Sequence, residues 1–363
     1  MSAGVLEISS SRSCAEDVTP ERIAELTMQL ASLLEGAVDD IALMNREAEV
    51  LSLNARIEAA RAGDLGAAFG VVAHAMSQLS SRTANSAKEL SRGSGKLIGD
   101  LRRMNELLTT ETLGLRLSDL ALGNIDLVDR NLYERSCDVR WWATDDSLVQ
   151  ALSEPRYERL EHASRRLGVI LNAYTVYFDL VLCDLHGTVV ANGRPKAYPS
   201  QGSDQSQAPW FRAALATASG DEFGFQSVHR SALVQHQRAL VYSCAVREGG
   251  DAKGKPLGVL GIVFNWDGLG QVILDRIPLS TEEKSSAVAC FTDVDGQVLA
   301  DYPAGALGAQ FELPDRGRLM NAGKNFLMTG WKGKPACVGH ARSQGFETYA
   351  TGWHSFVLLL EER

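Results

Sequence analysis

Two heptad-patterned segments flank residues 54–73, and they constrain the fold of this chain more than any other feature. On both sides, small and apolar residues recur at alternating steps of four and three, which places them along one side of a helix and predicts supercoiling. Small residues between Ala59 and Gly66 permit a tight reversal. We therefore predict an antiparallel coiled-coil hairpin with its tip near residues 58–66. Its expected apolar seam contains Leu30, Leu34, Ala37, Ile41, Met44, Ala48, Leu51 and Ala55, and on the return arm Phe69, Val72, Met76, Leu79 and Thr83.

The first helix has a clear beginning. Thr19 is a favourable N-cap, and Pro20 suits the first helical position. The hairpin is expected to cover residues 19–111, after a disordered segment at 1–18. With a reversal near residue 64, Pro20 would lie opposite Leu108 on the return arm.

Composition limits the classes of function. A chain of 363 residues has room for two or three domains. A net charge of −9 without a basic face argues against nucleic acid or an anionic membrane as the main partner. No apolar run approaches the ~18 residues that span a bilayer, so a cytoplasmic protein is expected. The six cysteines are dispersed and are expected to be buried free thiols. No catalytic, metal or cofactor motif is present, so we expect neither an enzyme nor a cofactor.

The tip resembles the signalling tip of methyl-accepting chemotaxis receptors. The resemblance is carried by the run from Ile57 to Gly63 and by Phe69 and Val71-Val72-Ala73. It implies signalling to a chemotaxis histidine kinase and its coupling adaptor, at receptor arrays near the membrane. A homodimer is also expected, because an isolated two-helix hairpin leaves one flank of its apolar seam in water. The residues expected to bind these partners are Asn54, Ile57, Glu58, Arg61, Asp64 and Phe69.

Some tip positions depart from the family's pattern. Arg56, Ala67 and His74-Ala75 stand where other residues are usual. The arms are short, and no adjacent glutamate pair of the kind that is methylated occurs in them. An alternative is therefore a sensor scaffold whose hairpin dimerises with, or regulates, a partner outside chemotaxis.

After residue 111 the pattern changes twice. Residues 112–167 remain helix-like and are expected to form a linking helix. From residue 168, short apolar runs separated by Gly, Pro and Asp are typical of antiparallel strands. The pattern D-x-x-G-x-V-[VL]-A occurs at 184–191 and again at 293–300, which predicts a strand, tight turn and strand used twice. We predict two sheet lobes, at 168–277 and 287–363, and an α + (α+β) fold overall.

The two lobes resemble a double Cache sensor, a tandem of PAS-like lobes that binds small molecules. Pro209-Trp210-Phe211 matches the family's Pro-Trp-aromatic signature. Ala208 and Val263 replace the charged pair that members binding amino acids carry, so a small carboxylate or an apolar compound is expected instead. The first lobe is expected to hold this ligand. Its candidate residues are Trp210, Phe211, His229, Arg230 and Tyr242, although Trp210 and Tyr242 equally suit a packed core and His229 a surface position.

Overall fold

The computed structural model describes residues 19–303, 305 and 308–361. The chain divides into two compact units, one ending at Thr112 and the other beginning at Leu113. The predicted disorder of residues 1–18 lies outside the described residues, as does Cys14. Within the described part, no helix is long and apolar enough to cross a membrane.

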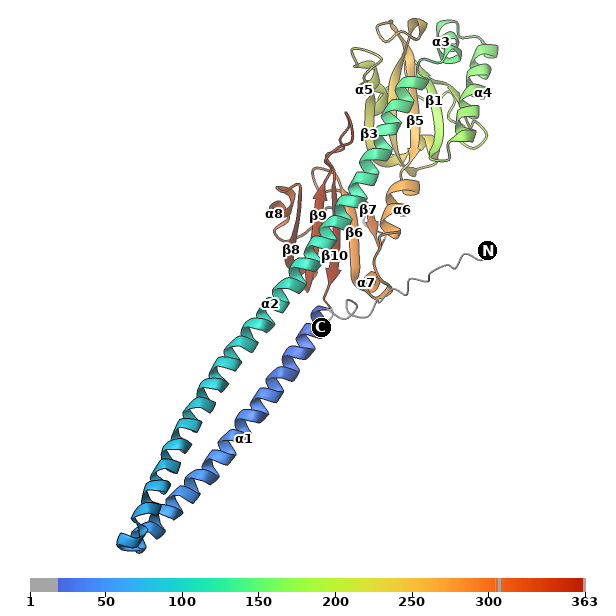
Figure 1. Ribbon diagram of the computed structural model, residues 1–363. Coiled ribbons are helices and arrows are strands. Elements are labelled where there is room, and N and C mark those ends of the chain that lie inside the picture. The colour runs from blue at the N-terminus through green and yellow to red at the C-terminus, as the bar shows by residue number, and fades with distance from the viewer. Residues whose placement is uncertain (1–18, 304, 306–307, 362–363) are drawn as a thin grey trace, which may run out of the picture. The chain divides into compact units, whose positions relative to one another are not determined.

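The first unit is a helical hairpin (Figure 1). Helix α1 (Pro20–Arg61) and helix α2 (Ala67–Trp142) are joined by a 3₁₀ turn, η1 (Gly63–Gly66). The Thr19 side chain accepts a hydrogen bond from the Arg22 N–H at 3.2 Å, as an N-cap does. Gly66 is required at the reversal because a Cβ there would lie 2.2 Å from the Ala59 carbonyl oxygen.

Small and polar residues hold the two arms together. Ser52 Oγ donates to the Ala73 carbonyl at 2.7 Å, and Asn105 Nδ2 donates to the Pro20 carbonyl at 3.0 Å. Pro20 therefore faces Asn105, three residues before the predicted Leu108. Among the hairpin residues whose burial the structure describes, the buried positions are Thr27, Ser52, Gly66, Ala73, Ser80 and Ala87.

The predicted apolar seam requires a correction. Leu30, Met44 and Leu51 are 45%, 63% and 59% exposed, so they do not lie between the two arms of one chain. Small residues bring the arms close together, and the larger apolar residues form a second stripe beside this contact. The heptad pattern did not separate these two stripes, because their positions are adjacent in the sequence, as with the exposed Leu51 and the buried Ser52.

The predicted linking helix, 112–167, is three helices. These are the end of α2, α3 (Asp146–Ser153) and α4 (Tyr157–Ala173). The interruption after Trp142 has a local cause, because the Asp145 side chain caps α3 by accepting from the Ser147 N–H at 2.9 Å. Helix α2 itself is continuous from the tip to Trp142 and belongs to both units.

The second unit contains two five-stranded antiparallel sheets, as predicted. The first has the order β2-β1-β5-β4-β3 and the second the equivalent order β7-β6-β10-β9-β8. The first-lobe strands are β1 (Tyr177–Asp184), β2 (Val189–Asn192), β3 (Gly224–Ser231), β4 (Gln237–Arg247) and β5 (Pro256–Asn265). The second-lobe strands are β6 (Ala287–Thr292), β7 (Val298–Tyr302), β8 (Lys324–Trp331), β9 (Lys334–Arg342) and β10 (His354–Leu360). The short helices are α5 (Pro209–Leu215), α6 (Val272–Asp275), α7 (Thr281–Ser286) and α8 (Arg316–Met320).

The sequence repeat is a repeated turn. One carboxylate oxygen of Asp184 accepts two backbone N–H groups at 2.9 Å each, and Asp293 does the same at 3.0 and 2.8 Å. Gly187 and Gly296 have φ of 87° and 89°, a left-handed conformation that favours glycine. The two lobes are therefore built on the same strand, turn and strand.

The sheets share one core along α2. The inner faces of both sheets and the buried side of α2 form a single hydrophobic cluster. Gly339 on β9 permits the closest approach, since a Cβ there would lie 2.2 Å from the Leu117 carbonyl carbon on α2. The outer faces carry two separate clusters, beside α5 in the first lobe and α8 in the second. Cys183, Cys244, Cys290 and Cys337 are buried within these cores, and burial raises the pKa of each thiol.

Candidate functional site

The hairpin tip presents charge and apolar surface together. Glu58 and Arg61 form an ion pair at 2.8 Å, with both side chains mostly exposed. Phe69 is 71% exposed and Leu65 is 93% exposed. The other predicted partner-binding residues, Asn54, Ile57 and Asp64, are also exposed. All six are therefore accessible to a partner.

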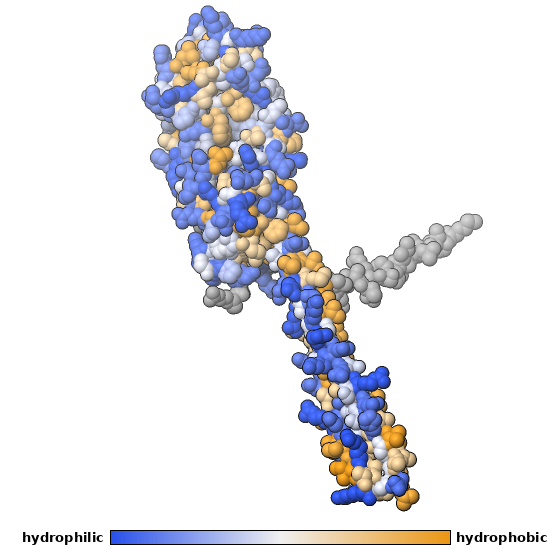
Figure 2. All heavy atoms as spheres, turned by 90° about the vertical axis from the view of Figure 1, so that its left-hand side faces the viewer, coloured by the Kyte–Doolittle hydropathy of each residue, from blue (hydrophilic) through white to orange (hydrophobic). Residues whose placement is uncertain are grey.

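Apolar side chains are exposed along the whole hairpin (Figure 2). Figure 2 shows hydrophobic residues on the visible face of both the arms and the turn end. A stripe of this length exceeds the scattered apolar residues of an ordinary monomer surface. Members of the stripe, each at least 43% exposed, include Leu30, Met44, Leu51, Val72, Leu79, Leu97 and Leu101.

In the first lobe, α5 packs tightly on the outer face of the sheet. Trp210 and Phe211 are 2% and 3% exposed and meet edge to face, with ring centroids 6.0 Å apart. The Trp210 indole covers Gly261 of β5, where a Cβ would lie 2.8 Å from the ring. Ser243 Oγ donates to the Trp210 carbonyl at 2.7 Å. These contacts are those of a packed core.

The remaining predicted ligand residues lie elsewhere. Tyr242 is on the inner face and hydrogen-bonds Tyr349 of the second lobe. His229 Nδ1 lies 2.8 Å from the Ser227 carbonyl, and the exposed Arg230 donates to the His236 carbonyl. The five predicted side chains thus do not converge on one cavity, and their role in ligand binding stays a prediction.

A small cavity remains at the edge of the first lobe. It has a volume of about 230 Å³ and is lined by Tyr198, Ser200 and Leu233 among others. Beside this cavity, the buried Asp179 accepts a hydrogen bond from Asn192 Nδ2 at 2.7 Å. Burial raises the pKa of Asp179 to about 6, although the donated hydrogen bonds oppose this shift.

The second lobe contains a much larger cavity, of about 1070 Å³. It lies on the outer face of that sheet, where α8 buries only Leu319. One wall is aromatic, since Phe311 and Trp331 both line it with ring centroids 5.1 Å apart. The fully buried Phe356 packs against Phe311, with centroids 4.7 Å apart. The other lining residues include the apolar Val288, Cys290, Val298 and Leu313 and the polar Asp301, Gln310, Glu312, Arg316 and Lys332.

Two histidines are buried close to this wall. His340 Nε2 lies 2.9 Å from His354 Nδ1, and the His340 and Phe356 ring centroids are 4.8 Å apart. Burial lowers the pKa of His340 to about 3 and that of His354 to about 4. Both rings are therefore neutral at neutral pH.

The segment between β9 and β10 is fastened to α2. The buried Asp129 of α2 accepts hydrogen bonds from Ser343 Oγ at 2.7 Å, the Gly345 N–H at 3.0 Å and Thr351 Oγ1 at 2.9 Å. The same segment carries Tyr349, which contacts the first lobe. The segment between β9 and β10 is thus in contact with both α2, through Asp129, and the first lobe, through Tyr349.

Comparison with known proteins identifies the hairpin. Residues 16–111 match the model of the methyl-accepting chemotaxis protein (MCP) signalling domain. This match confirms the resemblance predicted from the tip. The chain is 40% identical over 81 residues to the biofilm dispersion protein BdlA of Pseudomonas aeruginosa, covering 22% of this chain and 19% of that protein. It is 39% identical over 72 residues to the aerotaxis receptor of Escherichia coli, covering 20% and 13%. The chain thus spans less than a fifth of either relative.

The second unit resembles solved sensor domains in fold. The sensor domain of the Vibrio cholerae histidine kinase DctB aligns with 70% of this chain and 100% of its own length, with a TM-score of 0.54 and 14% identity. The sensory domain of the Campylobacter jejuni chemoreceptor Tlp3 aligns over 69% and 94%, with a TM-score of 0.53 and 15% identity. The predicted fold class, a helical hairpin followed by two PAS-like antiparallel lobes, is confirmed.

Sequence reasoning missed several residues of these sites. Asp129 gave no signal because a lone acidic residue in a helix is ordinarily solvated. Tyr349 lies in an irregular segment whose contacts depend on both lobes. The second-lobe cavity was missed because the second lobe has no motif like Pro209-Trp210-Phe211. In the first lobe, however, the Trp210 side chain of that motif is packed in the core and does not line a cavity.

Proposed function

We propose that this chain is a chemoreceptor-like signal transducer. The sensor unit binds a small molecule, and the MCP-type hairpin passes the resulting change to a chemotaxis histidine kinase and its coupling adaptor. The observation that carries the proposal is α2, which is one uninterrupted helix from the tip at Ala67 to the sensor core at Trp142. A shift or rotation of its sensor half is therefore transmitted along a covalently continuous element.

The proposal includes a homodimer. The hairpin buries only small residues between its own arms and leaves the stripe of Leu30, Met44 and Leu51 in water. Two copies placed with these stripes together would form a four-helix bundle with a buried apolar centre. A second copy fits better than an unrelated partner because the stripe extends along both arms, as a self-complementary bundle requires.

We place the sensed molecule in the second-lobe cavity, in contrast to the first-lobe site that the sequence predicted. Its volume reaches the upper end of the range usual for ligand pockets, while Trp210 and Phe211 occupy the outer face of the first lobe. The aromatic wall and Arg316 favour a compound with an apolar body and a small anionic or polar group. Ligand must prefer one arrangement of the lobes, since equal affinity for both would shift nothing.

The proposal also covers the kind of protein and its place in the cell. We propose a cytoplasmic protein without catalytic activity that acts through binding alone. The charge of −9 and the accessible tip are compatible with a protein partner. Coupling of ~1–3 kcal/mol between ligand and output would suffice for signalling.

A reconstituted kinase assay tests the output. The purified full chain is added to a chemotaxis histidine kinase and its coupling adaptor, and kinase autophosphorylation is measured. The expected result is co-sedimentation of the three proteins and a change in the phosphorylation rate. Absence of both effects would contradict the kinase relay.

One alternative has specific support. Arg56, Ala67 and His74 depart from the usual tip, and one relative of the hairpin is named a biofilm dispersion protein. These observations favour a scaffold whose hairpin regulates a partner outside chemotaxis. A dimer that fails to bind the kinase but keeps its hairpin fold would support this alternative.

A further inference from the structure

Two arginines face each other at the end of the first sheet. Arg230 on β3 and Arg238 on β4 are direct cross-strand partners in the antiparallel register. Side chains at such positions extend from the same face and lie close together, and like charges there are destabilising. Two further polar residues, His236 and Gln237, line the same groove. A negative charge placed between the two guanidinium groups would relieve this repulsion.

The described residues that line the groove supply one carboxylate for the two guanidinium groups. Arg238 Nε pairs with Asp267 Oδ1 at 2.6 Å, and the Arg238 side chain is only 17% exposed. Arg230 has one hydrogen bond, from Nη1 to the His236 carbonyl at 3.3 Å. Among the described residues that line this groove, Asp267 is the sole acidic side chain against two guanidinium groups.

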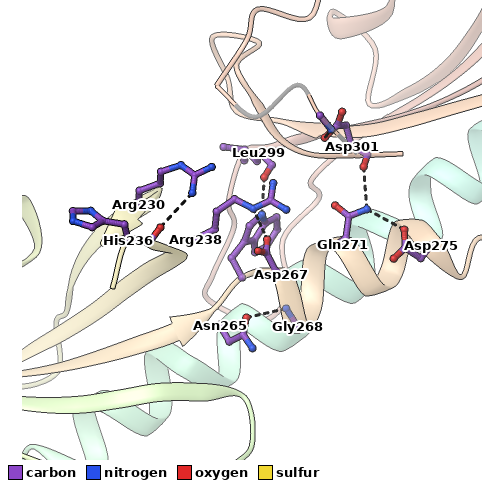
Figure 3. A network of polar contacts seen from close by, with 12 residues as sticks. Arg230, His236, Arg238, Asn265, Asp267, Gly268, Gln271, Asp275, Leu299 and Asp301 are labelled. Carbon is purple, nitrogen blue, oxygen red and sulfur yellow. Dashed lines mark hydrogen bonds and ion pairs between the residues drawn. The ribbon is translucent and has the colours of Figure 1, made fainter. Parts of the chain in front are cut away.

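The two guanidinium groups line one groove between the lobes (Figure 3). The groove has a volume of about 780 Å³ and also receives Asn265, whose Oδ1 is occupied by the Gly268 N–H at 3.0 Å. In Figure 3 both arginine side chains extend from the β3–β4 hairpin toward the second lobe, on the side where Leu299 and Asp301 lie. The side-chain amide nitrogen of Asn265 supplies a further donor group at the groove.

The turn that presents the arginines is held in an uncommon conformation. Gln235 and His236 have φ of 57° and 62°, and left-handed residues other than glycine are rare. Beside the groove, the lobes are joined by two further contacts. The Trp266 indole N–H donates to the Leu299 carbonyl at 2.7 Å, and Gln271 Nε2 donates to the Asp301 carbonyl at 3.0 Å. The groove is therefore part of the lobe junction.

We propose that this groove binds a small oxyanion, such as phosphate or a short dicarboxylate, between Arg230 and Arg238. Guanidinium groups bind phosphate and carboxylate oxygens in a bidentate manner. Such an anion would reduce the repulsion between the two positive charges of Arg230 and Arg238. The site is distinct from the second-lobe cavity proposed above for the sensed molecule. Because the anion occupies the lobe junction, it stabilises one arrangement of the lobes and acts as a second effector.

Binding is tested on the full chain in a phosphate-free buffer. Sodium phosphate and sodium succinate are titrated separately by calorimetry, and thermal unfolding is followed in parallel. Sodium chloride at equal ionic strength is the control for screening. Saturable binding of phosphate alone, of succinate alone or of both supports the proposal and assigns the ligand to phosphoryl compounds, carboxylates or oxyanions in general. Failure of both anions to bind saturably overturns it.

Matched variants locate the site. Arg230 is exposed, so Arg230→Gln is expected to fold normally and to weaken anion binding by about tenfold or more. Arg238→Lys keeps a positive charge for Asp267 but removes the planar donor pair, and it should weaken binding as well. Arg165→Gln is the control, because Arg165 is an exposed arginine paired with Glu161 on α4. Unchanged affinity in both Arg230→Gln and Arg238→Lys would contradict the proposal. The readout is binding alone, so a failure of the kinase relay leaves this test intact.

Discussion

The hydroxyl of Tyr242, on β4 of the first lobe, hydrogen-bonds the hydroxyl of Tyr349, in the segment between β9 and β10 of the second lobe. Burial raises the pKa of both phenols, so both stay protonated across the physiological range. Phe223 packs against both rings, at 5.7 and 6.1 Å between centroids. This cluster is a direct connection between the lobes.

A double-mutant cycle measures that connection. Tyr242→Phe and Tyr349→Phe each leave one buried hydroxyl unpaired, so each is expected to lower the free energy of unfolding by ~1–3 kcal/mol. The double variant should cost less than the sum of the two, since no unpaired hydroxyl remains. Chemical denaturation of the four proteins gives the coupling. Strict additivity would mean that the two hydroxyls are not coupled in solution.

Asp129 is expected to hold the segment that carries Tyr349. Asp129→Asn replaces an acceptor oxygen with a donor that faces the hydroxyl and N–H donors of Ser343, Gly345 and Thr351. It should therefore cost ~1–3 kcal/mol and increase hydrogen exchange across residues 343–352. Asp126→Asn is the control, because Asp126 forms only an exposed ion pair with Arg130 on the same helix. Equal exchange in the two variants would show that Asp129 does not fasten the segment.

Charge in the exposed stripe should separate the dimer. Leu51→Asp places a carboxylate where the second copy is expected to pack, and burial of an unpaired charge should weaken association by several kcal/mol. Light scattering at micromolar concentration measures the mass. Ser32→Asp, on an exposed position seven residues before Asp39, should leave the dimer intact. A monomeric parent protein with a folded hairpin would reject the four-helix bundle.

The tip charges are expected to matter for binding but not for folding. Exposed ion pairs contribute ~0–1 kcal/mol, so Glu58→Ala and Arg61→Ala should leave the thermal unfolding temperature nearly unchanged. Both variants should lose kinase and adaptor binding, since such charges fix an interface. Arg22→Ala breaks a similar ion pair with Glu25 at the other end of the hairpin and is the control. If the two tip variants bind like the parent, the receptor-type interface is wrong.

Acid should weaken the second unit through its buried histidines. The folded pKa of His340 is about 3 and that of His354 about 4, below the ordinary value near 6.5. Their contribution is therefore present above pH ~6.5 and is lost as the pH falls toward 4. For His340 the slope reaches up to ~1.4 kcal/mol per pH unit.

Asp179 acts in the opposite direction. Its folded pKa of about 6 is raised, so its contribution is present below pH ~4 and is lost as the pH rises through 6. Between pH 4 and 6 the two histidines outweigh this one carboxyl, and stability should rise with pH. Urea denaturation at pH 4.5–7 checks the sign: His340→Gln should flatten the profile and Asp179→Asn should steepen it. The same slope in all three proteins would contradict these assignments.

The two antiparallel lobes of the second unit could be predicted from the sequence, and the reason is local chemistry. Asp184 and Asp293 each form the same turn with a following glycine, and that turn depends on four adjacent residues. The helical reversal near Gly63 is likewise encoded by neighbouring small residues. The prediction of one helix over 112–167 was wrong, because this segment forms three helices. The helix-like pattern gave no sign of the break after Trp142, where the Asp145 side chain caps a new helix.

The sequence by itself determined the hairpin, its resemblance to the MCP signalling domain and the duplicated antiparallel lobes, because periodicity, turn chemistry and short motifs are properties of residues close together in the chain. The tertiary structure alone decided which apolar residues of the hairpin face its own arms, that Trp210 fills its pocket, and where cavities remain. It also brought Arg230 opposite Arg238 and Tyr242 onto Tyr349. These relationships depend on strand register and on packing between residues far apart in sequence, and neither leaves a local pattern.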